Sequence, residues 1–135
     1  MERRVLHPAD LGKPLGAYSH GFEVRAGRLI FVAGQVAIDA SGALVGKGSI
    51  QAQTRAVFAN IRKVLSAGGA TFEHVVKFTT YLVNSRDIEG YFEARAAIFP
   101  ELFPQGIYPP NTLLIIDRLV REDLLIEIEA IAAVD

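Results

Sequence analysis

The order of strand-like and helix-like segments predicts an α+β fold in which one β-sheet carries two helices on one of its faces. Strand-like runs occur before, between and after two segments whose apolar residues recur at helical spacing. With 135 residues, the chain is long enough for one hydrophobic core and too short for two. We therefore expect residues 1–135 to form a single domain.

The N-terminal segment is expected to be an irregular arm, with no regular element before about Gly21. Turn-favouring residues interrupt any regular pattern there: Pro8, Gly12, Pro14 and Gly16. Two short apolar runs, residues 22–24 and 29–32, flank a Gly-containing turn, which predicts a β-hairpin. A strand-like run at 36–38 is followed by a turn at 39–42.

The segment SIQAQTRAVFANIRKVLSAGG (49–69) has the clearest helical pattern of the chain. Ser49 is suited to cap its N-terminus, and Gly68 with Gly69 can end it in the left-handed conformation. Its regularly spaced residues are Ile50, Thr54, Val57, Ile61, Val64 and Leu65. A strand is predicted from Val75, where VVKFTTYLV is rich in β-branched and aromatic residues.

A second helix is predicted over residues 88–99, where aromatic and apolar residues recur every three or four positions. Pro100 and Pro104 are expected to end this helix, because proline lacks the N–H that a helix interior needs. Two strands, residues 112–116 and 124–134, are predicted to complete the chain around a turn-prone segment.

The last predicted strand, LLIEIEAIAAV, places Glu127 and Glu129 on one face, because side chains alternate along a strand. The opposite face is expected to enter the core and contains Leu124, Ile126, Ile128 and Ala130. Most charged residues are exposed, so a solvated face explains both carboxylates. In an interface cleft, desolvation would instead raise the pKa of Glu127 towards the range of a general acid or base. The pattern leaves both alternatives open.

Helices on one face leave the other face of the sheet without cover. The side chains expected there are only partly polar: Thr79, Tyr81, Leu113, Ile115 and Ile131. Exposed apolar surface of this kind favours self-association, most often as a closed symmetric oligomer.

Composition excludes several kinds of site. The net charge of −1 gives no basic footprint of the kind that nucleic-acid-binding proteins carry. The absence of cysteine excludes disulfides, thiolate metal sites and cysteine nucleophiles. The histidines have no metal-ligand spacing: His7, His20 and His74. No segment approaches the ~20 apolar residues of a membrane span, and we expect a cytoplasmic protein.

Two short motifs resemble functional signatures without meeting their requirements. The GKGS segment (46–49) precedes a helix as a phosphate loop does, but Gly42 is one residue too close and Gly48 occupies the hydroxyl position. Ser19 and His20 are adjacent, yet no G-x-S-x-G elbow is present. We interpret the GKGS segment as a loop with a helix cap, and Ser19 with His20 as the polar end of an arm.

Five blocks of the sequence resemble, in order, those of the Rid family of reactive intermediate deaminases. Its members are also called YjgF proteins and were formerly described as L-PSP endoribonucleases or translation inhibitors. The blocks extend over nearly the whole chain and are LGAYSHG (15–21), FVAGQVAID (31–39), AQTRAVFANIRKVLSAGGA (52–70), VVKFTTYLVN (75–84) and LLIEIEAIAAV (124–134).

The resemblance implies a chorismate-mutase-like fold, with a mixed β-sheet and two helices packed on one face. It also implies a homotrimer whose sheets form a central barrel with clefts between subunits. The implied reaction is hydrolysis of a small enamine or imine, such as 2-aminoacrylate, to a keto acid and ammonia. No metal or organic cofactor is expected, because an imine is already electrophilic.

Individual site residues of the family can be matched to this sequence. Tyr18 corresponds to the tyrosine of the family's GPY motif, and Gly34 to the glycine of SGQ, whose backbone lines the cleft. Glu127 corresponds to the glutamate of IEIEA that is thought to position or activate water. Phe92 aligns with an asparagine of many deaminating members. The resemblance thus implies catalytic roles for Glu127 and Tyr18.

The chain departs from the family pattern where an arginine grips the substrate carboxylate. Asn111 occupies that position, and Thr112 and Leu113 follow in place of the usual serine and cysteine. A charge-assisted hydrogen bond is roughly twice as strong as a neutral one, so the amide leaves about 1.5 to 3 kcal/mol of recognition unsupplied. Four other arginines are candidates to enter the cleft: Arg86, Arg95, Arg118 and Arg121.

Three functions follow from these observations. The first is an enamine or imine deaminase acting on a small substrate that lacks the α-carboxylate or presents it differently. The second is a non-catalytic trimer that binds a small metabolite and regulates a partner, which the loss of the family arginine favours. Ribonuclease activity or translation inhibition is the weakest, because the charge is balanced and no basic aromatic platform is present.

Overall fold

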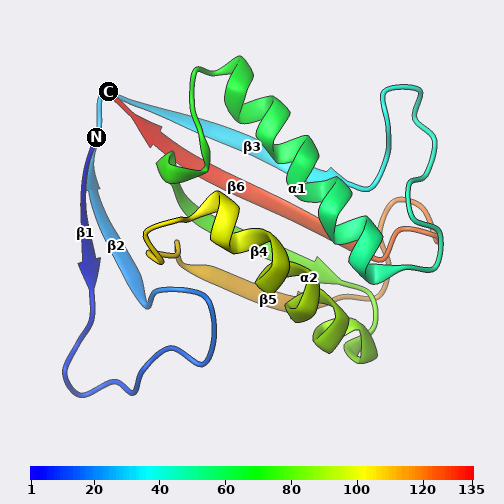
Figure 1. Ribbon diagram of the computed structural model, residues 1–135, viewed down its shortest axis with the longest axis horizontal. Coiled ribbons are helices and arrows are strands. Elements are labelled where there is room, and N and C mark those ends of the chain that lie inside the picture. Colours follow the sequence, from blue (N-terminus) through cyan, green and yellow to red (C-terminus); the bar gives the residue numbers. More distant parts are fainter.

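The computed structural model describes all 135 residues and contains a four-stranded mixed sheet with both α-helices on the same face (Figure 1). In sheet order the strands are β3 (Arg28–Val36), β6 (Ile126–Val134), β4 (Val75–Leu82) and β5 (Asn111–Ile115). β6 runs antiparallel to β3 and β4, whereas β5 runs parallel to β4. The helices are α1 (Ile50–Ala67) and α2 (Ile88–Leu102), with short 3-10 turns at Phe72–His74 and Ser85–Asp87. The expected α+β fold is confirmed.

The N-terminal segment is not wholly irregular, and this expectation was wrong for its first residues. β1 (Glu2–Leu6) pairs antiparallel with β2 (Gly21–Arg25) in a separate two-stranded sheet. The guanidinium of Arg3 lies 5.1 Å from the centre of the Phe22 ring, and Arg4 forms an ion pair with Glu23. The pairing joins residues about twenty positions apart, so local sequence gave no signal of it.

The predicted hairpin between residues 22–24 and 29–32 is also wrong, because β2 and β3 belong to different sheets. β3 pairs instead with the long apolar strand β6. Between β2 and β3, the Gly27 amide donates a hydrogen bond to the Val134 carbonyl oxygen at the end of β6, at 3.0 Å. A Cβ at Gly27 would lie 2.9 Å from the backbone carbonyl carbon of Asp135, so glycine lets the C-terminus pass close by.

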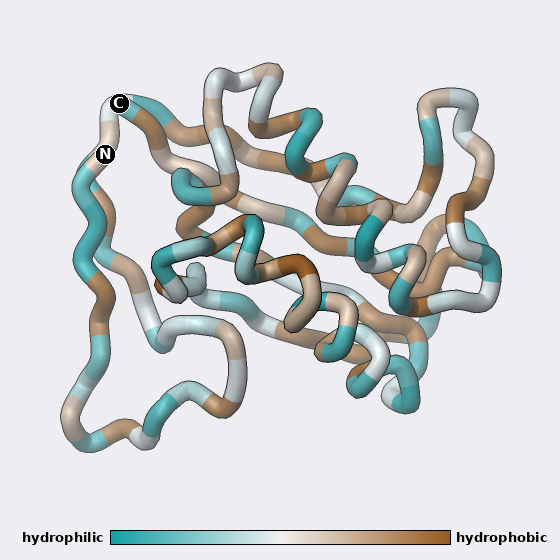
Figure 2. Tube along the Cα trace, in the orientation of Figure 1, coloured by the Kyte–Doolittle hydropathy of each residue, from teal (hydrophilic) through white to brown (hydrophobic).

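Helix α1 follows the prediction. The Ser49 hydroxyl accepts a hydrogen bond from the Ala52 amide at 3.1 Å, which satisfies one of the free N–H groups of the first turn. Gly69 has a φ of 72° and provides the left-handed turn after the helix, whereas Gly68 does not take that conformation. Hydrophobic and hydrophilic segments alternate along the helix (Figure 2), as expected for one buried and one exposed face.

Helix α2 extends beyond the predicted end at Phe99 and includes Pro100. Pro100 is exposed, and the helix continues to Leu102, with the Phe103 amide donating to the Phe99 carbonyl oxygen at 2.8 Å. Aromatic packing stabilises this last turn. The ring centres of Phe99 and Phe103 lie 5.0 Å apart, and the ring centre of Phe99 lies 5.6 Å from that of Phe58 in α1. Packing therefore outweighs the hydrogen bond that proline removes.

Ile126, Ile128 and Ala130 of β6 are buried as predicted, and Leu124, which precedes the strand, is buried as well. Ala132 of β6 is also buried. The prediction for β5 placed its side chains on the wrong faces. Leu113 and Ile115 pair with Thr80 and Leu82, which are fully buried beneath the helices. The uncovered face of β5 therefore carries Thr112 and Leu114, since a shift of one residue exchanges the two faces.

Substituting the cap of α1 tests the origin of this helix. Ser49→Ala should lower the free energy of unfolding by about 1 kcal/mol, because the Ala52 amide loses its acceptor. Ser66→Ala is the matched control, since Ser66 is exposed in the last turn of the same helix. Urea denaturation measures both, and an equal effect of the two changes would contradict the capping role of Ser49.

Candidate functional site

The uncovered face of the sheet carries the two glutamates of β6. Both side chains are partly exposed. Tyr81 of β4 donates a hydrogen bond from its hydroxyl to Oε1 of Glu129 at 2.9 Å. A neutral hydroxyl is required for this donation, and the bond to Glu129 is the main reason that the pKa of Tyr81 is raised. Glu129 thus has a structural partner within the sheet.

Glu127 lies against a glycine of the neighbouring strand. β3 contains an irregularity between Val32 and Gln35, which brings Gly34 close to the Glu127 side chain. A Cβ at Gly34 would lie only 2.6 Å from Cδ of Glu127. The absence of a side chain at Gly34 therefore makes the room that the carboxyl group occupies.

The electrostatics of Glu127 favour a carboxyl group that holds its proton more tightly than usual. Burial raises its pKa above the ordinary glutamate value, and the nearby charge of Glu129 raises it further. A carboxyl with a raised pKa exchanges protons more readily near neutral pH than an ordinary one does. Glu127 is therefore chemically suited to proton transfer.

Asn111 lies on the opposite face of the sheet from Glu127. Its partner in the β4 register is Phe78, which is buried beneath the helices. The Thr80 hydroxyl donates to Oδ1 of Asn111 at 2.8 Å and also lies 3.4 Å from the Tyr91 hydroxyl of α2. One copy of the chain therefore does not bring Asn111 and Glu127 into a common site.

Tyr18 lies in the arm between β1 and β2, and its hydroxyl accepts a hydrogen bond from the Leu15 amide at 3.2 Å. Ser19 fixes the arm by donating from its hydroxyl to the Tyr108 carbonyl oxygen at 2.6 Å. A Cβ at Gly16 would lie 3.2 Å from Nη2 of Arg95. The arm therefore packs beside α2 and the segment that leads into β5.

The other residues matched to the family site are Thr112, on the uncovered face of the sheet, and Leu113 and Phe92, on the helix side. Thr112 accepts a hydrogen bond from Nζ of Lys77 at 2.8 Å, and both belong to the uncovered face. Leu113 packs against the core on the helix side. Phe92 is 44% exposed on α2, and the Arg95 guanidinium lies 4.7 Å from the centre of its ring.

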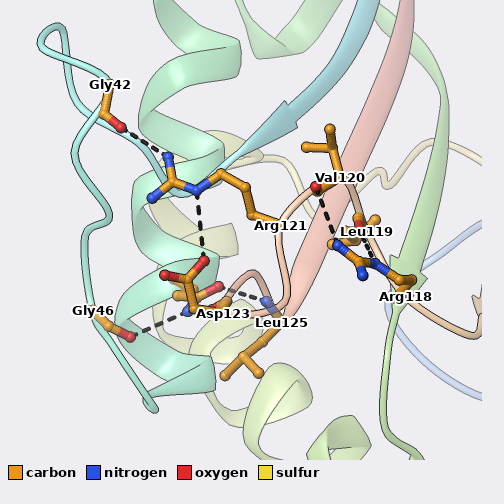
Figure 3. A network of polar contacts seen from close by, with 9 residues as sticks. Gly42, Gly46, Arg118, Leu119, Val120, Arg121, Asp123 and Leu125 are labelled. Atoms are coloured by element: carbon orange, nitrogen blue, oxygen red, sulfur yellow. Dashed lines mark hydrogen bonds and ion pairs between the residues drawn. The ribbon is translucent and has the colours of Figure 1, made fainter.

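Two of the four candidate arginines hold loops at the other end of the sheet (Figure 3). Arg121 donates to the Gly42 carbonyl oxygen at 2.9 Å and pairs with Asp123, and Arg118 donates to backbone carbonyls of its own loop. Arg86 is exposed. Arg95 alone among them is buried, and it contacts three aromatic rings of its own helix. Those rings lie four and three positions before Arg95 and four positions after it. This helical spacing could have indicated from the sequence that they contact Arg95.

The uncovered face also contains a hollow of about 340 Å³, with Phe31, Lys77, Thr79, Glu129 and Ile131 among its lining residues. No group of three or more acidic or histidine side chains is arranged to hold a metal ion. None of the helices combines the length and apolar character required to cross a bilayer.

Fold and site together define a small α+β protein whose uncovered sheet face carries a partly buried carboxyl with a raised pKa. The family model described as Endoribonuclease L-PSP matches residues 10–134. The chain therefore belongs to this family, the Rid or YjgF family.

Individual relatives agree with this assignment. A RutC family protein of Pyrococcus horikoshii is 37% identical over 130 residues, which cover 96% of this chain and 97% of the relative. A solved Rid family protein of unknown function from Yersinia pestis is 38% identical, with a TM-score of 0.86 over 99% of this chain and 100% of the other. The 2-iminobutanoate/2-iminopropanoate deaminase of Mus musculus is 29% identical, over 96% of this chain and 90% of the mouse protein.

The contact between Gly34 and Glu127 predicts a cost for any side chain at position 34. Gly34→Ala should lower the free energy of unfolding by about 1–3 kcal/mol, because the carboxyl group and its strand must move. Gly12→Ala is the control, since a Cβ there meets no atom within 4 Å, and it should change stability by less than about 0.5 kcal/mol. Urea denaturation would contradict the contact if the two variants were equally stable.

Titration of the Glu127 carboxyl tests the electrostatic account. Its pKa in the folded protein should exceed the ordinary value of 4.5, and Glu129→Gln should lower it in part. The folded state then binds the proton more tightly than the unfolded chain, so the contribution of Glu127 to stability becomes less favourable as pH rises from 4.5 to the raised pKa. NMR of the side-chain carboxyl carbon measures the pKa. A value at or below 4.5 in the wild type would refute this account.

Proposed function

We propose that the protein hydrolyses a small enamine or imine to a carbonyl compound and ammonia. The observation that carries this proposal is the Glu127 carboxyl, which has a raised pKa and lies against the bare backbone of Gly34. Membership of the Rid family supports the proposal. Similarity to the mouse 2-iminobutanoate/2-iminopropanoate deaminase supports it as well.

The proposed chemistry needs three proton transfers that one carboxyl group can serve, with the protonated imine as the reacting species. Ionised Glu127 accepts a proton from water as the water oxygen adds to the imine carbon, which gives a neutral carbinolamine. The protonated carboxyl then returns that proton to the nitrogen. The carboxylate so regenerated accepts the hydroxyl proton as the C–N bond breaks, the carbonyl forms and ammonia leaves. Tyr18 is proposed to close the site and to hydrogen-bond the reacting group. No cofactor is proposed, because the imine is itself the electrophile.

We propose further that the site is completed by a second copy of the chain. Asn111 and Glu127 lie on opposite faces of one sheet, so a cleft that contains both requires two subunits. Large apolar side chains on β3 are exposed, with Phe31 at 71% and Leu29 at 52%. Their burial would favour association through the uncovered face. The homotrimer implied by the family resemblance meets both requirements.

Asn111 favours one alternative function, a trimer that binds a small metabolite without transforming it and regulates a partner. The neutral amide replaces the charged group that grips a carboxylate in the family pattern, and its oxygen is already engaged by Thr80. Stabilisation of the wild type by 2-oxobutanoate, in the absence of any turnover, would support this alternative over the deaminase.

Turnover of 2-iminobutanoate, generated in the assay by an amino-acid dehydratase, tests the deaminase. Release of 2-oxobutanoate should exceed the spontaneous rate, and Glu127→Gln should lower kcat/KM by at least about 100-fold, the lower end of general acid–base catalysis. Glu101→Gln is the control, because this exposed carboxylate pairs only with Arg62. A wild-type rate equal to the spontaneous rate would refute the proposal.

A further inference from the structure

Two amide side chains of α1 form hydrogen bonds with the main chain of other elements. Gln53 is completely buried, and Asn60 is half-buried. They are seven residues apart, which is about two turns of the helix, so they lie on the same side of it. Burying an amide costs free energy unless its hydrogen bonds are made. The partners of these two amides therefore indicate what they hold in place.

Gln53 holds the main chain that leads into β6. Its Oε1 accepts a hydrogen bond from the Leu125 amide at 2.8 Å, two residues before Glu127. Its Nε2 donates to the carbonyl oxygens of Asp123 at 3.0 Å and Gly46 at 3.3 Å (Figure 3). The start of β6 is thus fixed from within α1.

Asn60 holds the neighbouring strand at the corresponding position. Its Nδ2 donates to the carbonyl oxygens of Val36 and Ile38, each at 3.0 Å. Val36 is the residue of β3 that pairs with Glu127, and it lies two positions after Gly34. The two amides therefore hold the two strands that bring Glu127 and Gly34 together.

Pairing between β3 and β6 is short where Glu127 meets Gly34. Glu127 is only the second residue of β6, and beyond the irregularity in β3 only residues 35 and 36 pair with β6. Strand ends open locally more readily than strand centres. A Cβ at Gly34 would lie 2.6 Å from Cδ of Glu127, so the two groups fit closely. Hydrogen bonds from α1 supply a restraint that the short pairing lacks.

We propose that Gln53 and Asn60 are positioning residues that hold the Glu127 carboxyl against Gly34 in the geometry that proton transfer requires. This inference rests on the proposed function, and it adds two residues that act through the main chain of β6 and β3. Positioning of this kind matters because a catalytic group displaced by about 1 Å can lose about 100-fold in rate. It also explains why amides occupy positions that apolar side chains would fill without needing partners.

Steady-state kinetics with 2-iminobutanoate tests the positioning role. Gln53→Met and Asn60→Leu remove each amide with little change in volume. Each should lower kcat at least about tenfold with little change in KM, because a displaced carboxyl slows proton transfer after the substrate has bound. Thr54→Val is the matched control, since Thr54 is completely buried beside Gln53 but donates to the Ile50 carbonyl oxygen of its own helix at 2.7 Å. It should lower stability and leave kcat unchanged.

NMR titration of the Glu127 carboxyl carbon gives a second readout that needs no turnover. Gln53→Met and Asn60→Leu should each lower the pKa of Glu127 towards the ordinary value of 4.5, because a displaced carboxyl gains contact with water. Thr54→Val should keep the wild-type pKa. Asn60→Leu alone decides the result if Gln53→Met does not fold, since Asn60 is only half-buried.

The outcomes separate this inference from the proposed function. A lowered Glu127 pKa in the amide variants of a protein without deaminase activity would support the positioning of Glu127 and refute the function. Deaminase activity together with an unchanged kcat and an unchanged Glu127 pKa in the folded variants would refute the inference and retain the function. Equal changes in Thr54→Val would show that the amides act only through overall stability, which would also overturn the inference.

Discussion

The central constraint of the structure is the pairing of β6 with a strand on each side. Both edges of β6 are occupied, so its side chains can point only towards the helices or towards the uncovered face. The apolar positions lie under α1 and α2, and this fixes Glu127 and Glu129 on the other face. The same pairing brings β3 and Gly34 beside Glu127 and places Tyr81 of β4 beside Glu129. The two carboxylates thus acquire different environments from one alternating pattern.

Elements with strong local signals could be predicted from the sequence. The helical spacing and the cap at Ser49 indicated α1, and the alternation of β6 indicated its buried face. Elements that depend on distant partners could not be predicted in this way. β1 exists because β2 supplies its hydrogen bonds, and β3 avoids the hairpin because β6 offers a longer partner. In β5 the alternation was recognised, but an error of one residue exchanged its faces.

The candidate site, too, could be predicted from the sequence only in part. Resemblance to a family identified Glu127, Gly34, Tyr18 and Asn111, but not the side of the sheet on which each lies. The irregularity in β3 that brings Gly34 to Glu127 was not predicted, although a glycine inside a strand-like run is a common signal of such an irregularity. Arg95 was one of four candidates until burial and aromatic contacts distinguished it from loop arginines such as Arg121. Because the matched residues lie on two faces of the sheet, the proposed activity depends on how the subunits are arranged.

The claim that two copies build one site is tested most directly by mixing two variants, each impaired at a different residue of the proposed site. Glu127→Gln and Tyr18→Phe subunits, carrying different tags, would be combined in mixed oligomers, purified by both tags and assayed with 2-iminobutanoate at low concentration. If one subunit supplies Glu127 and its neighbour supplies Tyr18, the mixed oligomers should regain activity well above either parent. Mixed oligomers with no more activity than their parents would contradict a shared site.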